Sequence, residues 1–424
     1  MPLSSWTWIA CLLAVAVSTA GECAEPAASP AASCTVELVA ARNGFDGTSC
    51  WVHARAGTIP AGEPGNPGRS PLVVMTMQKL LLSGSDVFYA LNGLRSGDGG
   101  ASWTEPVEQK AFVRQIVSTD RAAPLPTGGD IAPDLLRAGD ETTVCDFTPR
   151  WHAASRTLLG TGQTVWYREN KVMPVRPRGV AYAAYDAAKH EWRPWKLLDL
   201  PKEPRFQNAG AGSGQRCDLE NGDILIGVYH TTPGGRPYST TVFRCRFDGE
   251  TLQTVEQGNS LSIDVKRGLY EPSLIRCGGK FYLTLRNDDR GHVAVSDDGL
   301  NYSAARPWTF DDGEELGNYN TQQHWVTHGE ELYLVYSRRG AKNDHVFRHR
   351  APLFIGRVDR ESLRIVRASE QVLIPERGAG LGNFGVCEVS ENESWVVASE
   401  WMQPKGSEKY GSDNTVWIAK LRWR

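Results

Sequence analysis

The sequence lacks helical periodicity, long apolar runs and a strong net charge. Residues 9–17 form an apolar run too short for the about 20 residues of a transmembrane helix, so no membrane span is expected. A formal net charge of −3 gives no electrostatic reason to expect nucleic acid or an anionic membrane as a partner. No Cys-x-x-Cys pair and no phosphate-binding glycine loop occurs, so we expect neither a metal site nor a cofactor.

The N-terminal residues have the pattern of an export signal. The apolar run is followed by Ser18-Thr19-Ala20, a small-x-small cleavage pattern. We therefore predict a signal peptide over residues 1–20, a linker over 21–34 and a single domain over 35–424, exported to the periplasm or outside the cell. Gly21-Glu22 is a poor context for a lipid anchor on Cys23. Cleavage leaves eight cysteines, an even number that permits disulfides of unknown pairing.

One strand–turn–strand pattern recurs along the chain. Its turns fall near residues 154, 221, 278, 329 and 392, which are 51 to 67 residues apart, and Pro71 to Leu82 could belong to a first copy. A four-stranded antiparallel blade with long loops needs about this much chain. The repeat predicts an all-β fold, a six-bladed β-propeller with four-stranded blades. Seven blades, or an additional β-sandwich, are alternatives.

A second repeated pattern is a polar turn. Residues 96–103 read Ser-Gly-Asp-Gly-Gly-Ala-Ser-Trp, and residues 296–302 are a shorter copy that ends in Tyr302. We expect the Asp and Ser side chains to bond local backbone groups, with glycine allowing positive φ and the aromatic ring plugging the turn. The pattern resembles the Asp-box, or BNR repeat, of the sialidase (neuraminidase) superfamily. The resemblance implies a propeller, while the turns themselves lie away from the active site in that family.

The hairpin around Gly278-Gly279 offers the first candidate site residues. If these two glycines form the whole loop, Glu271 lies directly opposite Arg286 at the open end of the hairpin. An ordinary cross-strand ion pair is the competing interpretation, worth a few tenths to about 1 kcal/mol. The stretch is also similar to the sialidase blade in which a Glu polarises a tyrosine nucleophile and an Arg helps to clamp the substrate carboxylate.

The resemblance extends to one more residue and fails at two positions. Asp86 precedes the first polar turn by ten residues, as the general acid/base aspartate does in sialidases; a turn-capping role is the alternative. Where the family has Arg-Ile-Pro this chain has Gly57-Thr58-Ile59-Pro60, so one clamp arginine is missing or displaced to Arg55. Where the family has its tyrosine this chain has Phe384, which cannot act as a nucleophile.

A polar segment over residues 318–352 completes the prediction. It contains Tyr319 and His324, which could transfer a proton, and the possible ligand contacts Arg338, His345 and Arg350. His230 is expected to face the same rim. Any single histidine here could instead be structural or solvated.

The expected function is that of a carbohydrate-active protein. We predict an exo-glycosidase, similar to an exo-α-sialidase, that acts as a monomer on a glycan with an acidic sugar (sialic or uronic acid). Two alternatives remain open. One is a propeller lyase that acts by β-elimination at a uronic acid, and the other is a glycan-binding propeller without catalysis.

Overall fold

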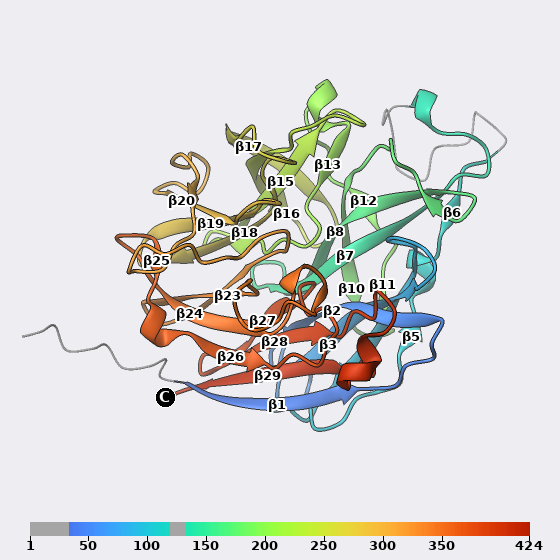
Figure 1. Cartoon of the computed structure of the whole chain (residues 1–424). Coiled ribbons are helices and arrows are strands. Elements are labelled where there is room, and N and C mark those ends of the chain that lie inside the picture. Colours follow the sequence, from blue (N-terminus) through green and yellow to red (C-terminus); the bar gives the residue numbers. More distant parts are fainter. Residues whose placement is uncertain (1–33, 119–132) are drawn as a thin grey trace, which may run out of the picture. The chain divides into compact units, whose positions relative to one another are not determined.

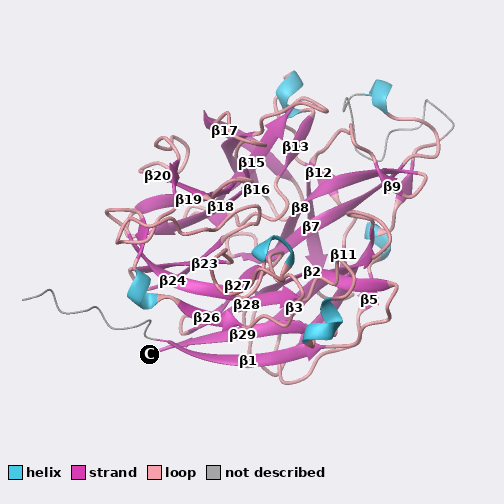
Figure 2. Cartoon of the chain, viewed as in Figure 1, coloured by secondary structure: helices cyan, strands magenta, loops and turns pink. Residues whose placement is uncertain are grey.

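The computed structural model describes residues 34–118 and 133–424, and these residues are almost entirely β-strands and loops (Figures 1 and 2). The predicted signal peptide and all but the last residue of the predicted linker lie outside this range. In the described part, no helix is long and apolar enough to cross a membrane. The only helices described there are single 3₁₀ turns: η1 (Lys110–Phe112), η2 (Pro133–Leu135), η3 (Pro204–Phe206), η4 (Phe347–His349), η5 (Arg367–Ser369) and η6 (Ser407–Tyr410).

The described strands form six antiparallel sheets. Sheet 1 contains β2 (Ser49–Ile59), β3 (Leu72–Leu81), β4 (Phe88–Ser96) and β5 (Val107–Glu108). Sheet 2 contains β6 (Gln115–Ile116), β7 (Glu141–His152), β8 (Thr157–Arg168), β9 (Lys171–Val172), β10 (Val180–Asp186), β11 (Glu191–Trp192) and β12 (Lys196–Leu197). Sheet 3 contains β13 (Asn208–Gly210), β14 (Cys217–Asp218), β15 (Asp223–Thr231), β16 (Ser239–Phe247) and β17 (Leu252–Leu261).

The remaining sheets come from the second half of the chain and its N-terminal strand. Sheet 4 contains β18 (Tyr270–Cys277), β19 (Lys280–Arg286), β20 (His292–Ser296) and β21 (Arg306–Pro307). Sheet 5 contains β22 (His324–His328), β23 (Glu331–Tyr336), β24 (Leu353–Asp359), β25 (Arg364–Ile365) and β26 (Gln371–Ile374). Sheet 6 contains β27 (Gly385–Ser390), β28 (Glu393–Ser399), β29 (Val416–Trp423) and β1 (Cys34–Arg42).

Each sheet contacts the next one through at least one pair of strands. β2 contacts both β7 and β27, β8 contacts β13, β15 contacts β18, and β22 contacts both β18 and β27. Each sheet is thus packed between two others, which is the propeller arrangement of small antiparallel sheets that the repeat predicts. The prediction of four strands per sheet is right for sheets 1, 4 and 6, whereas sheets 2, 3 and 5 have additional short strands.

The two ends of the described domain meet in sheet 6. β1 is the outermost strand and pairs with β29, from Cys34 opposite Trp423 to Ala40 opposite Trp417. Apolar side chains of sheets 5 and 6, among them Val326, Ile355 and Val396, form one buried cluster between the two sheets. Burial of such side chains, about 25 cal/mol per Å² of apolar surface, is what holds neighbouring sheets together.

The predicted hairpins and polar turns have the expected local geometry. Gly329-Glu330 is a two-residue loop, since His328 pairs with Glu331. In the polar turn at 96–103, Asp98 accepts a hydrogen bond from the Ser102 backbone N–H at 3.0 Å and one from its hydroxyl at 2.5 Å. The backbone N–H groups of residues 300 and 301 donate in the same way to Asp298 in the second turn.

The cysteines within the described residues form no disulfides with one another. All seven cysteines in the described residues are unpaired, and six of them are buried. Their environment is apolar, and burial raises the pKa of the Cys387 and Cys50 thiols to about 12. These cysteines therefore serve as small apolar side chains of the core.

Candidate functional site

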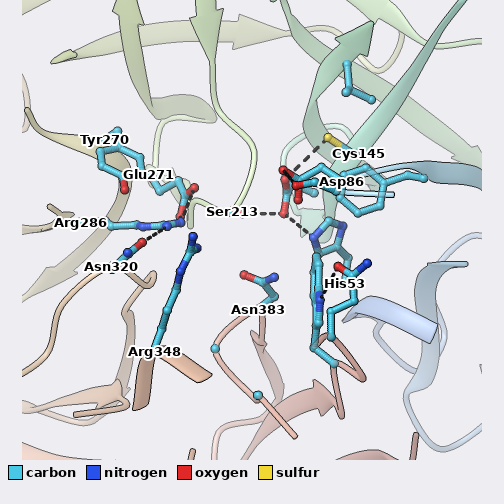
Figure 3. A pocket seen from close by; sticks show the side chains of 18 of the residues that line it. His53, Asp86, Cys145, Ser213, Tyr270, Glu271, Arg286, Asn320, Arg348 and Asn383 are labelled. Atoms are coloured by element: carbon cyan, nitrogen blue, oxygen red, sulfur yellow. Dashed lines mark hydrogen bonds and ion pairs between the residues drawn. The ribbon is translucent and has the colours of Figure 1, made fainter. Parts of the chain in front are cut away.

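A cavity of about 890 Å³ lies at the N-terminal ends of the innermost strands. β2 contributes His53 to it, β7 contributes Asp146 and β18 contributes Glu271. Figure 3 shows Glu271, Arg286 and Arg348 on one side and His53 and Asp86 on the other. The C-terminal parts of β2 and β7 line a second cavity of about 960 Å³. β2 and β7 therefore run from the first cavity to the second.

Register shifts in three inner strands place polar side chains in the first cavity. β2, β7 and β18 each contain a register shift, and at these shifts His53, Asp146 and Glu271 have φ values of 55°, 54° and 46°. Seven non-glycine residues that line the cavity have positive φ: His53, Asp86, Asp146, Ser213, Glu271, Asn320 and Arg348. Such conformations cost about 1–3 kcal/mol each and cluster at functional sites. This concentration of strain marks the cavity as a candidate active site.

The predicted Glu271–Arg286 pair is present, with a different register. Near the loop Cys277 pairs with Lys280 as predicted, but the bulge after Tyr270 places Tyr270, not Glu271, opposite Arg286. The prediction of direct pairing is therefore wrong by one residue, because two residues of β18 face one residue of β19. The Glu271 carboxylate still accepts two hydrogen bonds from Nη1 of Arg286, at 2.7 and 2.8 Å. Asn320 Oδ1 accepts one from its Nη2 at 2.7 Å.

Two further arginines on the same side have no acidic partner. Arg350 donates from Nε and Nη2 to the backbone carbonyl of Asn320, at 3.2 and 2.6 Å. Burial, and then the charges of Arg286 and Arg348, lower the pKa of Arg350. In the part of the chain that the structure describes, no carboxylate forms a salt bridge with Arg348 or Arg350. This side of the cavity is short of negative charge and is suited to a carboxylate ligand.

The other side holds a buried network around Asp146. Its Oδ1 lies 2.5 Å from the Ser213 hydroxyl, 3.2 Å from Nε2 of His53 and 3.3 Å from Nη2 of Arg55. Burial opposes ionisation of Asp146, but His53 and Arg55 lower its pKa to about 2. Asp86 stands exposed above this network on the loop between β3 and β4. A carboxylate that is accessible to solvent can exchange protons with a bound ligand.

Three tyrosines form the wall that joins the sides of the cavity from sheets 3 and 4. The rings of Tyr229, Tyr238 and Tyr270 lie 5.5 to 6.1 Å apart. Burial raises the pKa of Tyr229 and of Tyr270, whose hydroxyl contacts Arg267 and Asp288. For Tyr238, nearby arginines overcome burial and the pKa is lowered. Among these three, Tyr238 is the phenol that ionises most readily.

The predicted site residues divide between the cavity and other places. Asp86, Glu271, Arg286 and Arg350 line it. Tyr319 lies outside its lining, bonded to Nδ1 of His349 at 2.6 Å.

His324 is also outside, fully buried between the Ser273 hydroxyl and the Phe384 carbonyl, and burial lowers its pKa to about 3. His324 is therefore a satisfied structural histidine in this structure.

Three more predicted ligand contacts do not reach the cavity. Arg338 is held by Glu370, with contacts of 2.7 and 2.8 Å. His345 pairs with Glu376 at 3.0 Å and is not part of the cavity lining. His230 is buried beside Phe206 and contacts Thr241 at 2.9 Å. The expected convergence of the whole 318–352 segment is corrected to Asn320 and the loop residues 347, 348 and 350.

The structure also shows where the two residues that depart from the sialidase pattern, Phe384 and Gly57, are located. Phe384 is fully buried, and its neighbour Asn383 lines the cavity instead. Gly57 lies at the far end of β2, where a Cβ would come within 2.7 Å of the Pro149 carbonyl oxygen, so no arginine fits there. Arg55 does not line the cavity, since its side chain is bound beneath it to Asp146 and Gln322.

Several cavity residues were missed at the level of sequence. His53, Asp146, Arg176, Arg178 and Arg348 carry no motif. A signal for Asp146 existed, because an acidic residue inside an otherwise apolar strand is costly unless it is paired. No group of three or more His, Cys, Asp and Glu side chains within residues 34–118 and 133–424 is placed to hold a metal ion.

Solved structures with a similar fold include several sialidases. Trypanosoma rangeli sialidase matches with a TM-score of 0.57 and 12% identity, over 91% of this chain and 59% of that chain. A leech intramolecular trans-sialidase matches with a TM-score of 0.54 and 11% identity, over 91% of this chain and 70% of that one. A Dyadobacter fermentans protein of unknown function matches with a TM-score of 0.57 and 14% identity, over 92% and 99%.

The sequence comparisons do not assign this chain to a family. No family model and no curated protein matches the sequence. This chain spans 59% of the length of the trypanosomal enzyme. At such identities the likeness establishes a sialidase-like fold, and the chemistry has to be argued from the cavity itself.

Proposed function

We propose that the protein is an exported glycoside hydrolase that acts as a monomer, and that its six sheets are the blades of one sialidase-like propeller. The proposed reaction is the removal of an acidic sugar, a sialic or uronic acid, from a glycan. The observation that carries the proposal is the pair of unneutralised arginines, Arg348 and Arg350, beside the Glu271–Arg286 pair in a strained cavity. Such a group of guanidinium side chains binds a carboxylate through paired, charge-assisted hydrogen bonds.

Each side of the cavity has a role in this proposal. Arg286, Arg348 and Arg350 hold the sugar carboxylate, and Glu271 fixes the orientation of Arg286. Asp86, on the opposite side, donates a proton to the leaving oxygen and later accepts one from water (Figure 3). Asn320 and Asn383 are placed to bond sugar hydroxyl groups.

The first test is a panel of acidic glycans. The purified protein is incubated with sialosides and with glucuronic and galacturonic acid glycans, and released sugar is measured by chromatography. We expect release from at least one acidic glycan and none from the neutral counterparts. Binding without release from any glycan would assign the cavity to recognition alone, and absence of both would reject the proposal.

A second candidate reaction is β-elimination at a uronic acid. Phe384 supplies no hydroxyl at the position of the sialidase nucleophile, whereas Tyr238 lines the cavity with a lowered pKa. In an elimination, arginines neutralise the carboxylate and a base takes the proton from the adjacent carbon. A carbon–carbon double bond forms as the C–O bond breaks, and the leaving oxygen takes up a proton from water. Tyr238 as phenolate would be that base.

The Tyr238→Phe variant distinguishes the two reactions. For elimination we expect an unsaturated product that absorbs in the ultraviolet and a fall in kcat of about 100-fold or more in the variant. Its matched control is Tyr410→Phe, an exposed tyrosine that does not line the cavity. A saturated product together with unchanged kcat in Tyr238→Phe would exclude elimination through this residue.

A further inference from the structure

We propose that the cavity contains a second anion-binding subsite, formed by Arg176, Arg178 and Arg236. It deepens the proposed function and rests on it, because the first acidic group of the ligand is taken to bind at Arg348 and Arg350. The ligand class that follows is a glycan with two anionic groups, the second being a carboxylate or a sulfate on the same or the next sugar.

The three arginines come from two sheets and surround one phenol. Arg176 and Arg178 lie just before β10, and Arg236 lies in the loop between β15 and β16 with Tyr238. Burial raises the pKa of Tyr238, but the charges of Arg178, Arg176 and Arg236 and a hydrogen bond from Asn208 outweigh burial and lower it. Three positive charges therefore act on the same ring.

No acidic residue neutralises this group. Within the described ranges, none of the three guanidinium groups forms a salt bridge with a carboxylate. Nη1 of Arg178 donates to the Tyr229 hydroxyl at 2.7 Å, and Nη1 of Arg176 donates to the Met173 carbonyl at 2.6 Å. Nε of Arg176 is buried without a hydrogen-bond partner. Burial, and then the charge of Arg178, lower the pKa of Arg176. An anion bound here would relieve the repulsion between the guanidinium groups.

The position of Arg178 is built into the fold. Only 9% of this residue is exposed, and its side chain occupies space that Gly210 leaves free. A Cβ on Gly210 would lie 2.7 Å from Cδ of Arg178 and 2.2 Å from Oε1 of Gln163. The same Gln163 oxygen accepts a hydrogen bond from the Tyr229 hydroxyl at 2.7 Å. Arg178 is thus preorganised, which reduces the entropy that an anion would have to overcome on binding.

The second subsite is close to the first but distinct from it. The Arg178 guanidinium lies 5.1 Å from the Tyr229 ring, that ring lies 6.1 Å from Tyr270, and the Arg286 guanidinium lies 4.7 Å from Tyr270. The tyrosine wall therefore separates the two arginine groups inside one cavity. In the proposal, one acidic group of the ligand binds at each place.

The test compares matched ligands that differ by one negative charge. One pair is sialyllactose and disialyllactose, and the other is an unsulfated chondroitin disaccharide and its sulfated form. Affinities are measured by calorimetry on the full-length protein. For at least one pair we expect the ligand with two charges to bind about tenfold tighter or better than its partner. The pair that shows the gain identifies the second group as carboxylate or sulfate.

Variants of the three arginines test whether they cause the tighter binding of the ligand with two charges. The double variant Arg176→Ala with Arg236→Ala removes the two less buried arginines, and we expect it to abolish the tenfold advantage while affinity for the singly charged partner stays within about twofold. Arg306→Ala, at an exposed arginine on β21, should change neither affinity. If the second charge gives no gain, or the double variant weakens both ligands equally, the subsite is refuted and the proposed function stands. If no acidic glycan binds, both fail.

Discussion

Replacing Arg350 with alanine is expected to lower kcat/KM for the acidic glycan that the panel identifies by about 30- to 1,000-fold. The reason is that a buried, charge-assisted contact is worth about 2–4 kcal/mol when one partner is removed. Arg350 is held against the Asn320 carbonyl and has no acidic partner of its own, so its charge is free for the ligand. Steady-state kinetics of wild type and variant provide the measurement.

The Arg350→Lys variant distinguishes the effect of the positive charge from that of the guanidinium geometry, and Arg306→Ala is the control. Arg350→Lys keeps the positive charge but cannot make a two-pronged contact, so its activity should lie between wild type and alanine. Arg306→Ala, outside the cavity, should retain wild-type activity. A folded Arg350→Ala protein with kcat/KM within about threefold of wild type would show that this arginine does not hold the substrate.

The second large effect concerns stability. Asp146→Asn should lower the free energy of unfolding by about 3–5 kcal/mol, because it leaves the buried Arg55 charge without its partner. The Asp146 side chain is 11% exposed and that of Arg55 is 1% exposed. The matched control is Asp297→Asn, whose side chain is 87% exposed beside Lys280 and should change stability by less than about 0.5 kcal/mol. Urea unfolding monitored by tryptophan fluorescence gives both values. Equal effects in the two variants would contradict the assigned network.

The same variant should change how stability depends on pH. The pKa of Asp146 is about 2 in the folded protein, below its ordinary value of 3.8. A carboxyl group with a depressed pKa stabilises the fold above the ordinary value, and that contribution disappears as the pH falls through the folded value. We therefore expect the stability difference between wild type and Asp146→Asn to shrink between about pH 4 and pH 2.

Local patterns in the sequence were sufficient to predict that the fold is all-β and built from small antiparallel sheets. Two-residue turns such as Gly278-Gly279 and Gly329-Glu330 fix hairpins from neighbouring residues alone, and both occur as predicted. The Glu271–Arg286 contact followed from the same local arithmetic. The bulge that shifts its register did not, because an extra residue in one strand is stabilised by the residues around the cavity and not by its own sequence.

The cavity itself depends on long-range packing, which sequence patterns do not reveal. His324 and His345 look like candidates because histidines often serve as proton carriers, but packing from sheet 6 encloses the first and Glu376 holds the second. Arg178, by contrast, lies in a polar loop segment that contains no recognisable motif. Only the absence of a side chain at Gly210, 32 residues later, creates the space that it occupies.

The pairing of β1 with β29 has a consequence for biosynthesis. The ribosome makes β1 long before its partner β29, since β1 begins at Cys34 and β29 begins at Val416. Until then β1 has an unpaired edge, and such edges are prone to aggregation in a nascent chain. Sheet 6 can be completed only after β29 has been made, so folding of this domain is expected to be slow and to benefit from a chaperone that shields the unpaired edge of β1.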